Sequence, residues 1–145
     1  MLKNIKTYNP LSDYNKVIKK LNNNDVRPTK QRMVLAKLLF GKGKRHVSAE
    51  DLYTEVRKED RRISLATVYN TLHQFTRVGL LREIIVDSSC SYFDTNTSNH
   101  HHFYCEDSRE LTDIDGCDIQ FGQLPKPPAS KKISGVHVVV WIKSN

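Results

Sequence analysis

The sequence predicts an α+β fold, with an N-terminal winged helix-turn-helix domain followed by a small C-terminal α/β domain. Up to Gly79 the apolar residues recur with helical spacing, and after Gly79 they alternate with polar residues as in β-strands. Charge divides the chain similarly, because residues 1–82 carry 18 basic and 7 acidic side chains, whereas residues 83–145 carry 5 and 9. This asymmetry indicates that the first half meets a polyanion, although a solvated lysine-rich surface explains the charge equally well.

The first half is divided into four helices by residues that cap helix N-termini. Each cap can accept a hydrogen bond from a free N–H group of the first turn, and the caps are Ser12, Thr29, Ser48 and Ser64. Asp51, three residues after Ser48, completes a pattern similar to a capping box. The residues expected on the buried faces of the first two helices are Tyr14, Val17, Ile18, Leu21, Leu35, Leu38 and Leu39. Gly41 and Gly43 end the second helix, and Gly79 ends the fourth.

A β-hairpin is expected after the fourth helix. Residues 80–87, "LLREIIVD", and residues 90–95, "CSYFDT", alternate in polarity and are separated by a small polar turn of two serines. Four short helices followed by a hairpin describe a winged helix, in which the last helix enters the DNA major groove and the hairpin flanks it. We therefore expect a winged-helix domain over residues 1–95 and a polar linker over residues 96–99.

Residues 100–145 are expected to form a second domain built on a sheet. Its strand-like segments are "HHHFYCE", "ELTDI" and "GVHVVVWIK". The intervening "LPKPPASKK" is too rich in proline for a regular element, so we expect a loop there.

The fourth helix, "SLATVYNTLHQF", combines an apolar face with an unusual polar one. A helical wheel places Leu65, Val68, Leu72 and Phe75 together as the buried side. The opposite side carries Thr67, Asn70, Gln74 and Arg77, with Tyr69 and His73 at its borders. Short donors and acceptors suit base edges, where asparagine or glutamine pairs with adenine and a ring or methyl group touches thymine. The alternative is an ordinary surface helix with an uncommon polar mixture.

Basic residues lie on the elements that would flank this helix on DNA. They are Lys30, Arg32, Lys42, Lys44 and Arg45. Each phosphate that such a side chain neutralises would steepen the salt dependence of binding by roughly one unit of log-log slope.

Three consecutive histidines begin the second domain. Strand alternation sends His100 and His102 to one face and His101 to the other, so one strand can serve two sites. His46 precedes the third helix, Asp94 ends the hairpin and His137 lies in the last strand. Imidazole together with carboxylate suits a divalent transition metal such as zinc, iron or manganese. The alternatives are a coincidental polar strand and, for His46 or His137 taken singly, an ordinary core or surface histidine.

Composition favours a cytoplasmic protein. The three cysteines form no CxxC pair, the opening "MLKNIKTYNP" lacks the apolar centre of a secretory signal, and no apolar run is long enough to span a membrane. We therefore expect free thiols and no membrane partner.

These motifs together resemble the ferric uptake regulator family of metal-responsive transcription factors. The resemblance is carried, in the family's order, by "RPTKQR", "HVSAEDLY", "SLATVYNTLHQFTRVGLL", "YFDT" and the histidine run. "ISLATVYNTLHQF", "YFDTN" and "HHHF" are most similar to the iron response regulators (Irr) of alphaproteobacteria. The resemblance implies an amino-terminal winged helix that binds double-stranded operator DNA, a carboxy-terminal domain that forms a homodimer, and a metal site between the two.

The resemblance also assigns roles to particular residues. It implies that Tyr69 contacts DNA and that His46, Asp94, His100 and His102 bind the metal. Cys105 matches the first cysteine of the family's structural zinc, but Ser108 replaces the second and no pair follows the last strand, so a four-cysteine zinc is not expected.

A second family site loses its carboxylates in this chain. His101 replaces a frequent aspartate ligand, and no acidic residue follows Asp118. Neutral imidazoles suit haem iron, for which histidine is a common axial ligand. The Irr-like resemblance implies haem as well, and the candidate haem residues are His100, His101, His102 and His137.

The sequence therefore leaves three related regulators open. In the first, haem binding lowers the affinity for operator DNA. In the second, iron or manganese binding raises that affinity, and the third senses peroxide through bound ferrous iron. A non-haem metalloenzyme using His46, Asp94 and His102 is the alternative from another class. We expect no enzyme, since the ligands come from separate domains and neither an oriented base nor a cofactor loop is present.

Overall fold

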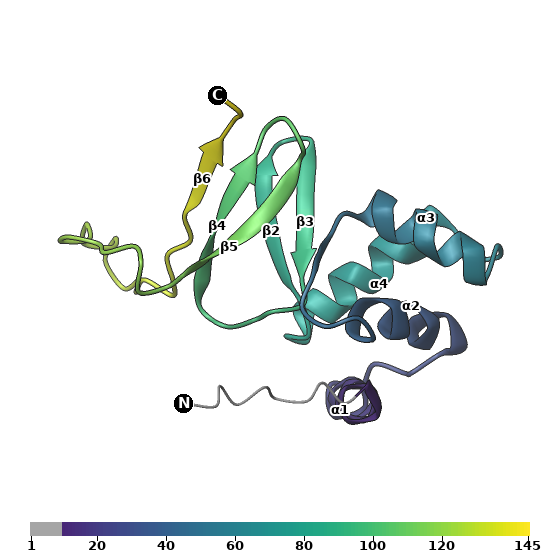
Figure 1. The fold of residues 1–145 in the computed structure, drawn as a ribbon. Coiled ribbons are helices and arrows are strands. Elements are labelled where there is room, and N and C mark those ends of the chain that lie inside the picture. Colours follow the sequence, from purple (N-terminus) through teal and green to yellow (C-terminus); the bar gives the residue numbers. More distant parts are fainter. Residues whose placement is uncertain (1–9) are drawn as a thin grey trace, which may run out of the picture. The chain divides into compact units, whose positions relative to one another are not determined.

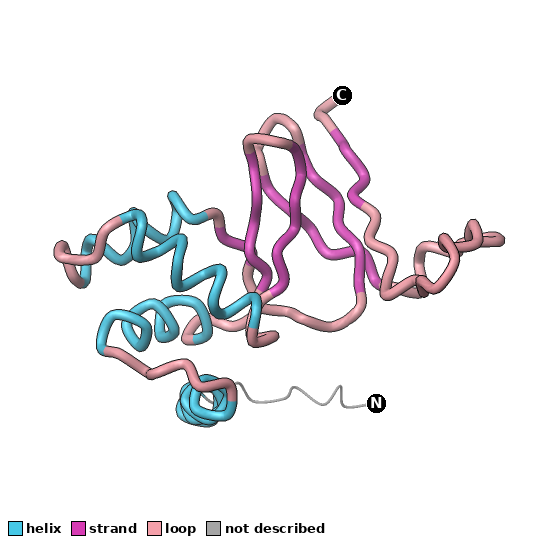
Figure 2. Tube along the Cα trace, turned by 180° about the vertical axis from the view of Figure 1, so that it is seen from behind, coloured by secondary structure: helices cyan, strands magenta, loops and turns pink. Residues whose placement is uncertain are grey.

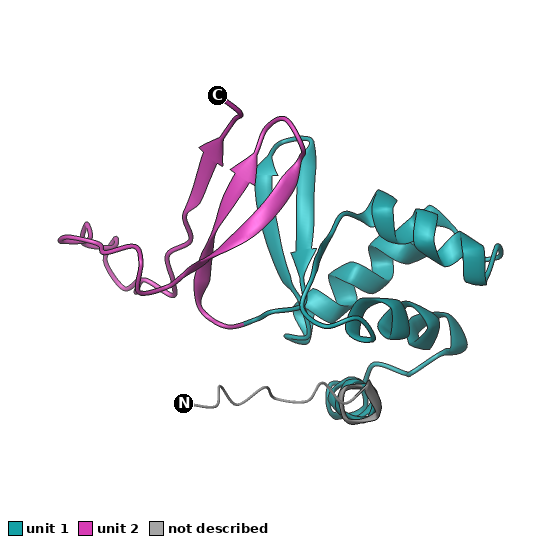
Figure 3. Ribbon diagram, in the orientation of Figure 1, with its two compact units in different colours: residues 1–97 teal, residues 98–145 magenta. Residues whose placement is uncertain are grey.

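The computed structural model describes residues 10–145, and residues 1–9 of the predicted winged-helix domain lie outside the described part. The chain divides into two compact units, Met1–Thr97 and Ser98–Asn145 (Figure 3). We call them the winged-helix unit and the histidine unit. No helix in the described part of the chain is both long enough and apolar enough to cross a membrane.

The described part of the winged-helix unit contains four helices and three strands. Along the chain these are α1 (Pro10–Asn23), α2 (Lys30–Phe40), β1 (His46–Val47), α3 (Ala49–Glu59), α4 (Leu65–Arg77), β2 (Arg82–Asp87) and β3 (Cys90–Asp94) (Figure 1). The strands form an antiparallel sheet in the order β1-β3-β2. The predicted hairpin is thus confirmed, and β1 adds a strand that the sequence analysis did not predict.

Side-chain caps define three of these helices as the sequence predicts. Thr29, Ser48 and Ser64 have extended backbones and accept hydrogen bonds from backbone N–H groups in the first turns of α2, α3 and α4. Helix α4 ends at Arg77, and Gly79 then adopts φ of 77°, a left-handed conformation that glycine tolerates well.

The first helix differs from its prediction. It begins at Pro10 rather than after a cap at Ser12, since proline fits the first helical position, where its missing N–H is not needed. Val17 and Leu21 are buried as expected, but Tyr14 is 37% exposed. Among the described side chains of α1, burial is therefore greatest at Val17 and Leu21.

The core of the winged-helix unit lies between α2, α3 and α4. Leu35, Leu39, Leu52, Leu72 and Phe75 are fully buried there. On α4 the predicted apolar side is buried except for Leu65, which is half-buried. Removing these side chains from water fixes the orientation of α4, and so determines which of its residues face outwards.

The histidine unit, residues 98–145, is described throughout, and its regular elements are three strands. These are β4 (His100–Cys105), β5 (Glu110–Asp115) and β6 (Val139–Ile142). The sheet order is β5-β4-β6, with β5 antiparallel and β6 parallel to β4. The long connection from β5 to β6 is a loop through the proline-rich segment, as expected (Figure 2). His137 precedes β6, so its predicted place in the last strand is wrong.

Candidate nucleic-acid interface and histidine clusters

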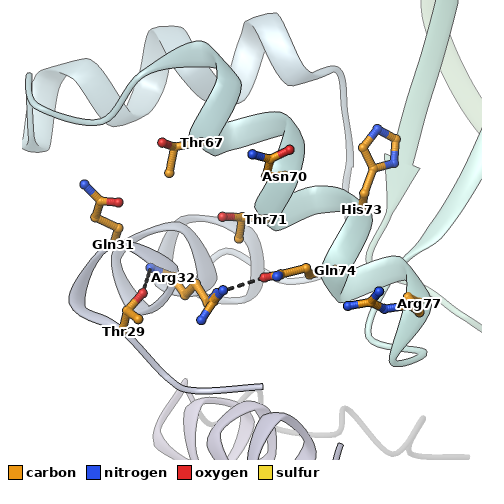
Figure 4. Close-up of a pocket in the computed structure, with 9 residues that line it drawn as sticks. All are labelled: Thr29, Gln31, Arg32, Thr67, Asn70, Thr71, His73, Gln74 and Arg77. Atoms are coloured by element: carbon orange, nitrogen blue, oxygen red, sulfur yellow. Dashed lines mark hydrogen bonds between the residues drawn. The ribbon is translucent and has the colours of Figure 1, made fainter. Parts of the chain in front are cut away.

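A polar groove lies between the start of α2 and the exposed side of α4 (Figure 4). Its volume is about 600 Å³. The residues that line it are Thr29, Gln31, Arg32, Thr67, Asn70, Thr71, His73, Gln74 and Arg77. Five residues predicted to bind DNA are thereby brought together, whereas Lys30 and Tyr69 are exposed outside this lining.

The sequence analysis missed part of this lining. Gln31 and Thr29 belong to the first turn and cap of α2, and the wheel of α4 alone could not place them in the groove. Thr71 is buried although it is polar, because it lies one turn after Val68 on the side facing α2. A helical wheel treats one helix alone, whereas this lining depends on how the N-terminal turn of α2 packs beside α4.

A hydrogen bond joins the two walls of the groove. Arg32 Nε donates to Gln74 Oε1 at 2.8 Å, and Arg32 Nη1 donates to the carbonyl oxygen of Arg27 at 2.6 Å (Figure 4 shows the first bond). These bonds restrict the rotamers of Arg32 and Gln74, so both polar groups are held in place before any ligand arrives.

Arg45, which the sequence predicts as a phosphate contact, has partners within the winged-helix unit. Its guanidinium forms a two-point ion pair with Glu55, and Nη1 also donates to the carbonyl oxygen of Leu38 at 3.1 Å. The hydrogen bond and positive charge of Arg45 lower the pKa of the Glu55 carboxyl, and Lys42, 3.6 Å from Glu55, adds to the effect. Arg45 thus links α2, β1 and α3.

His46 and Asp94 face each other across the sheet. They are register partners in β1 and β3, and His46 Nε2 lies 3.1 Å from Asp94 Oδ2. Asp94 is 1% exposed, and its other oxygen, Oδ1, accepts a hydrogen bond from the Asn96 N–H at 2.8 Å. A buried carboxylate needs such partners, because burial without them is costly.

Two histidines and one acid form a second cluster, entirely within the histidine unit. His100 Nε2 and His102 Nε2 each lie 3.4 Å from Asp113 Oδ1, and both imidazoles are buried. Asp113 is the register partner of His102 in β5. The sequence analysis missed it, although pairing the two strands across the turn at residues 106–109 would have predicted this register.

The hydrogen bond of His100 determines its tautomer. His100 Nδ1 lies 2.7 Å from the carbonyl oxygen of Ser98, which can only accept, so Nδ1 carries the proton. In the neutral ring Nε2 therefore has the lone pair and is the atom able to bind a metal. This arrangement, a carbonyl oxygen orienting a histidine, is common around metal ligands.

His101 and His137 form a separate contact. Their rings stack at 6.2 Å, and the edge of Phe121 meets His101 at 5.6 Å. His101 Nδ1 accepts a hydrogen bond from the Val138 N–H at 3.1 Å, so the neutral ring carries its proton on Nε2. His137 Nε2 lies 2.9 Å from His102 Nδ1, which connects this pair to the cluster around Asp113.

The fold and these sites together define a two-part protein, in which a winged helix with a polar groove precedes a sheet with buried histidines. The chain belongs to the ferric uptake regulator family, whose sequence profile matches residues 23–136.

Two curated relatives support this assignment. The peroxide-responsive repressor PerR of Staphylococcus saprophyticus is 36% identical over 97 residues, which cover 67% of this chain and 65% of that protein. PerR of Staphylococcus aureus is 34% identical over 99 residues, covering 68% and 63%. The match thus spans slightly less than two thirds of these relatives' length.

Solved structures of the family share the fold. The Vibrio cholerae ferric uptake regulator is similar with a TM-score of 0.68 at 21% identity, covering 88% of this chain and 99% of that one. The manganese-containing regulator from Pseudomonas aeruginosa gives 0.65 at 21% identity, covering 87% and 96%.

Proposed function

We propose that this protein is a cytoplasmic transcriptional regulator that binds operator DNA as a homodimer and whose affinity depends on a bound divalent metal ion. The observation that carries the proposal is the polar groove of the winged-helix unit, where Arg32 and Gln74 are held together. Family membership supports a regulator rather than a metalloenzyme. A two-fold symmetric dimer would match the symmetry of a palindromic operator.

In this proposal the groove contacts base edges and the surrounding cations contact phosphates. Asn70 and Gln74 supply the amides that pair with adenine, and Arg32 and Arg77 supply guanidinium donors. Lys30, exposed at the start of α2, supplies charge without base specificity.

The DNA-binding proposal is tested with a duplex selected from a random pool by the wild-type protein and with a shuffled duplex of the same composition. Gln74→Ala should weaken binding to the selected duplex by roughly 5- to 100-fold and change the shuffled duplex little. Gln123→Ala, in an exposed loop, is the matched control. Equal affinity of the wild-type protein for both duplexes would rule out sequence-specific binding.

We propose further that one divalent ion is bound by ligands from both units. The winged-helix unit contributes His46 and Asp94, and the histidine unit contributes His100, His102 and Asp113. Imidazole with carboxylate oxygen suits zinc, iron and manganese, and the five side chains together would supply four or more protein ligands, whereas each set alone would leave positions for water. Solved relatives include a manganese-containing ferric uptake regulator and a zinc-bound manganese uptake regulator. Such an ion would couple its own binding to the arrangement of the DNA-binding units.

Metal binding is measured as ions per chain after loading with Mn²⁺, Zn²⁺ or Fe²⁺ and removal of excess ion. Asp113→Asn and His102→Ala should each lower the affinity for the ion, whereas Asp118→Asn, an exposed acid, should not. If the affinity for DNA were the same with and without Mn²⁺, Zn²⁺ or Fe²⁺, control by metal would be refuted. The proposal that the protein binds DNA would still stand.

Two narrower versions of the proposal differ in the signal. The PerR relatives favour peroxide sensing. In this version the histidine and acidic ligands would hold ferrous iron, which would supply the redox chemistry for adding one oxygen atom of hydrogen peroxide to an imidazole, the other oxygen leaving as water. Peroxide treatment of the iron-loaded protein should then add the mass of one oxygen atom to a peptide containing His46, His100 or His102. Unchanged peptides would exclude this version.

Haem sensing of the Irr type is the second version. It is favoured by the imidazoles of His101, His102 and His137 and by the lack of acidic residues after Asp118. The Val138 N–H donates to Nδ1 of His101, so Nε2 would be the ring atom able to hold haem iron, once it has given up its proton. A haem titration should show an altered absorption band in the wild-type protein and not in His137→Ala; no band change in either would exclude direct haem binding.

A further inference from the structure

The side chain of Tyr69 is held by a neighbouring helix through its hydroxyl group. Tyr69 is 37% exposed on α4, and its Oη donates a hydrogen bond of 2.5 Å to Oε1 of Glu50, in the first turn of α3. A hydrogen bond to a carboxylate is stronger than one between neutral groups. The Glu50 contact raises the pKa of the Tyr69 phenol, because losing the proton would leave two negative charges side by side.

The ring of Tyr69 makes a second contact, with a histidine of its own helix. It stacks on His73, one turn further along α4, with the ring centroids 6.3 Å apart and the planes inclined by 23°. His73 in turn meets Phe93 edge-on at 5.7 Å, and Phe93 is buried in β3. Glu50 of α3 thus holds the hydroxyl end of Tyr69, while His73, which contacts Phe93 in β3, holds the ring.

We propose that Glu50 and His73 are specificity-determining positioning residues, which hold Tyr69 so that it offers its ring, and not its hydroxyl proton, to a base. The role rests on the proposed DNA-binding function. The hydroxyl proton is already donated to Glu50, so it is not available to a phosphate oxygen or a base acceptor. The Glu50 carboxylate also repels phosphates, which disfavours Tyr69 as a backbone contact. What remains is an apolar ring face and edge, which suits the C5-methyl group of thymine.

If Glu50 positions Tyr69, loss of its carboxylate should change affinity and selectivity in opposite directions. Removing the carboxylate should increase binding to any DNA, because a negative charge is lost near the phosphates. It should also decrease selectivity, because the freed hydroxyl can then donate to phosphates and several bases. Loss of a purely structural residue would not produce this combination.

The experiment measures the ratio of affinities for the duplex selected by the wild-type protein and for its shuffled counterpart. Glu50→Ala should bind the shuffled duplex more tightly and lower the ratio by roughly tenfold. Glu59→Ala, which removes the same charge from the other end of α3, should leave the ratio unchanged. Glu50→Gln keeps an acceptor for the hydroxyl and should retain the ratio.

The His73 contact is tested in the same assay. His73→Ala should lower the ratio, and His73→Phe, which keeps a ring against Tyr69 and Phe93, should restore most of it. Thermal melting of each variant identifies any that fail to fold, and the Glu50→Gln and His73→Phe variants preserve the packing most closely.

The Tyr69 hydroxyl can be followed without DNA by NMR of its ring carbon attached to oxygen during a pH titration. Its pKa should fall towards the ordinary tyrosine value in Glu50→Ala. The positioning role would be overturned if Glu50→Ala kept the wild-type ratio of affinities for the selected and shuffled duplexes, or if Glu59→Ala lowered that ratio equally. Either result would leave the proposed DNA binding intact. A wild-type protein that does not distinguish the duplexes would refute the proposed function, and this role with it, even where the titration shows the Glu50 contact.

Discussion

Substitution of Arg45 by alanine tests whether this residue stabilises the fold or contacts phosphate. Its guanidinium donates to both oxygens of Glu55 and to the carbonyl oxygen of Leu38, so it connects three elements. Its backbone N–H donates to Thr95 Oγ1 at 2.9 Å, and its carbonyl oxygen accepts from the Thr95 N–H at 3.1 Å. These backbone bonds border the His46–Asp94 pair, so loosening Arg45 should also loosen those two candidate ligands.

The magnitude follows from the exposure of the pair. Hydrogen bonds to charged groups contribute about 1.5–3 kcal/mol when buried, and an exposed ion pair contributes about 0–1 kcal/mol. The side chains of Arg45 and Glu55 are 20% and 26% exposed, so their pair lies between these limits. We expect Arg45→Ala to lower the free energy of unfolding by about 1–2 kcal/mol, of which about 1 kcal/mol is coupling with Glu55.

Urea unfolding of the wild-type protein, Arg45→Ala, Glu55→Ala and the double variant measures this coupling. The salt dependence of DNA binding gives an independent result. Arg45→Ala should leave its log-log slope unchanged, whereas Lys30→Ala should reduce the slope by about one unit. A coupling energy near zero would refute the structural link, and a slope reduced by about one unit in Arg45→Ala would show that Arg45 is a phosphate contact.

Four further substitutions test the stability of the winged-helix unit. Because the Glu55 pKa is lowered in the folded protein, its stabilisation is complete above the ordinary carboxyl value of 4.5 and is lost as the pH falls through the folded value. The advantage of the wild-type protein over Glu55→Gln should therefore shrink as pH decreases from about 5 to about 3, as measured by urea unfolding. Ser64→Ala removes the cap of α4 and should lower the unfolding free energy by about 1 kcal/mol; an unchanged melting temperature would contradict this. Phe75→Ala leaves a cavity at a fully buried site and should cost about 3–5 kcal/mol in the same unfolding measurement, or prevent folding. Gly79→Ala should cost about 1 kcal/mol because φ is 77° there, although no neighbouring atom obstructs the added methyl group, and a stabilised variant would disprove this reasoning.

The helices and the hairpin were predictable because their signals are local. Thr29, Ser48 and Ser64 act as caps through bonds to residues three positions later, so a short stretch of sequence contains the whole interaction. The apolar side of α4 follows from helical spacing in the same way. Pro10 shows the limit of this reasoning, since a proline and a serine nearby both begin helices well, and the prediction of a cap at Ser12 was wrong.

The contacts that the sequence did not predict join residues distant along the chain. Strand β1 has two residues, too few for any periodic pattern, and it exists because β3 pairs with it. In the sequence Arg45 cannot be distinguished from the neighbouring basic residues, because its ion pair with Glu55 forms only in the folded chain. Asp113 enters the histidine cluster only through the register of β4 and β5. In each case the side chains were visible in the sequence, but their partners depended on packing.

The sheet of the winged-helix unit also connects two of the five candidate ligands to the groove. His46 and Asp94 are paired in β1 and β3, and Val47 and Phe93 form the next pair. Phe93 meets His73, which lines the groove, so a shift of the Asp94 backbone would alter the support of a groove residue within the same unit. An ion bound by Asp94, as we propose, would therefore have a contiguous set of contacts within this unit through which to act on DNA affinity. Metal titration followed by NMR should then shift the His73 ring resonances before any DNA is added, and unshifted resonances would mean that the ion acts through the arrangement of units alone.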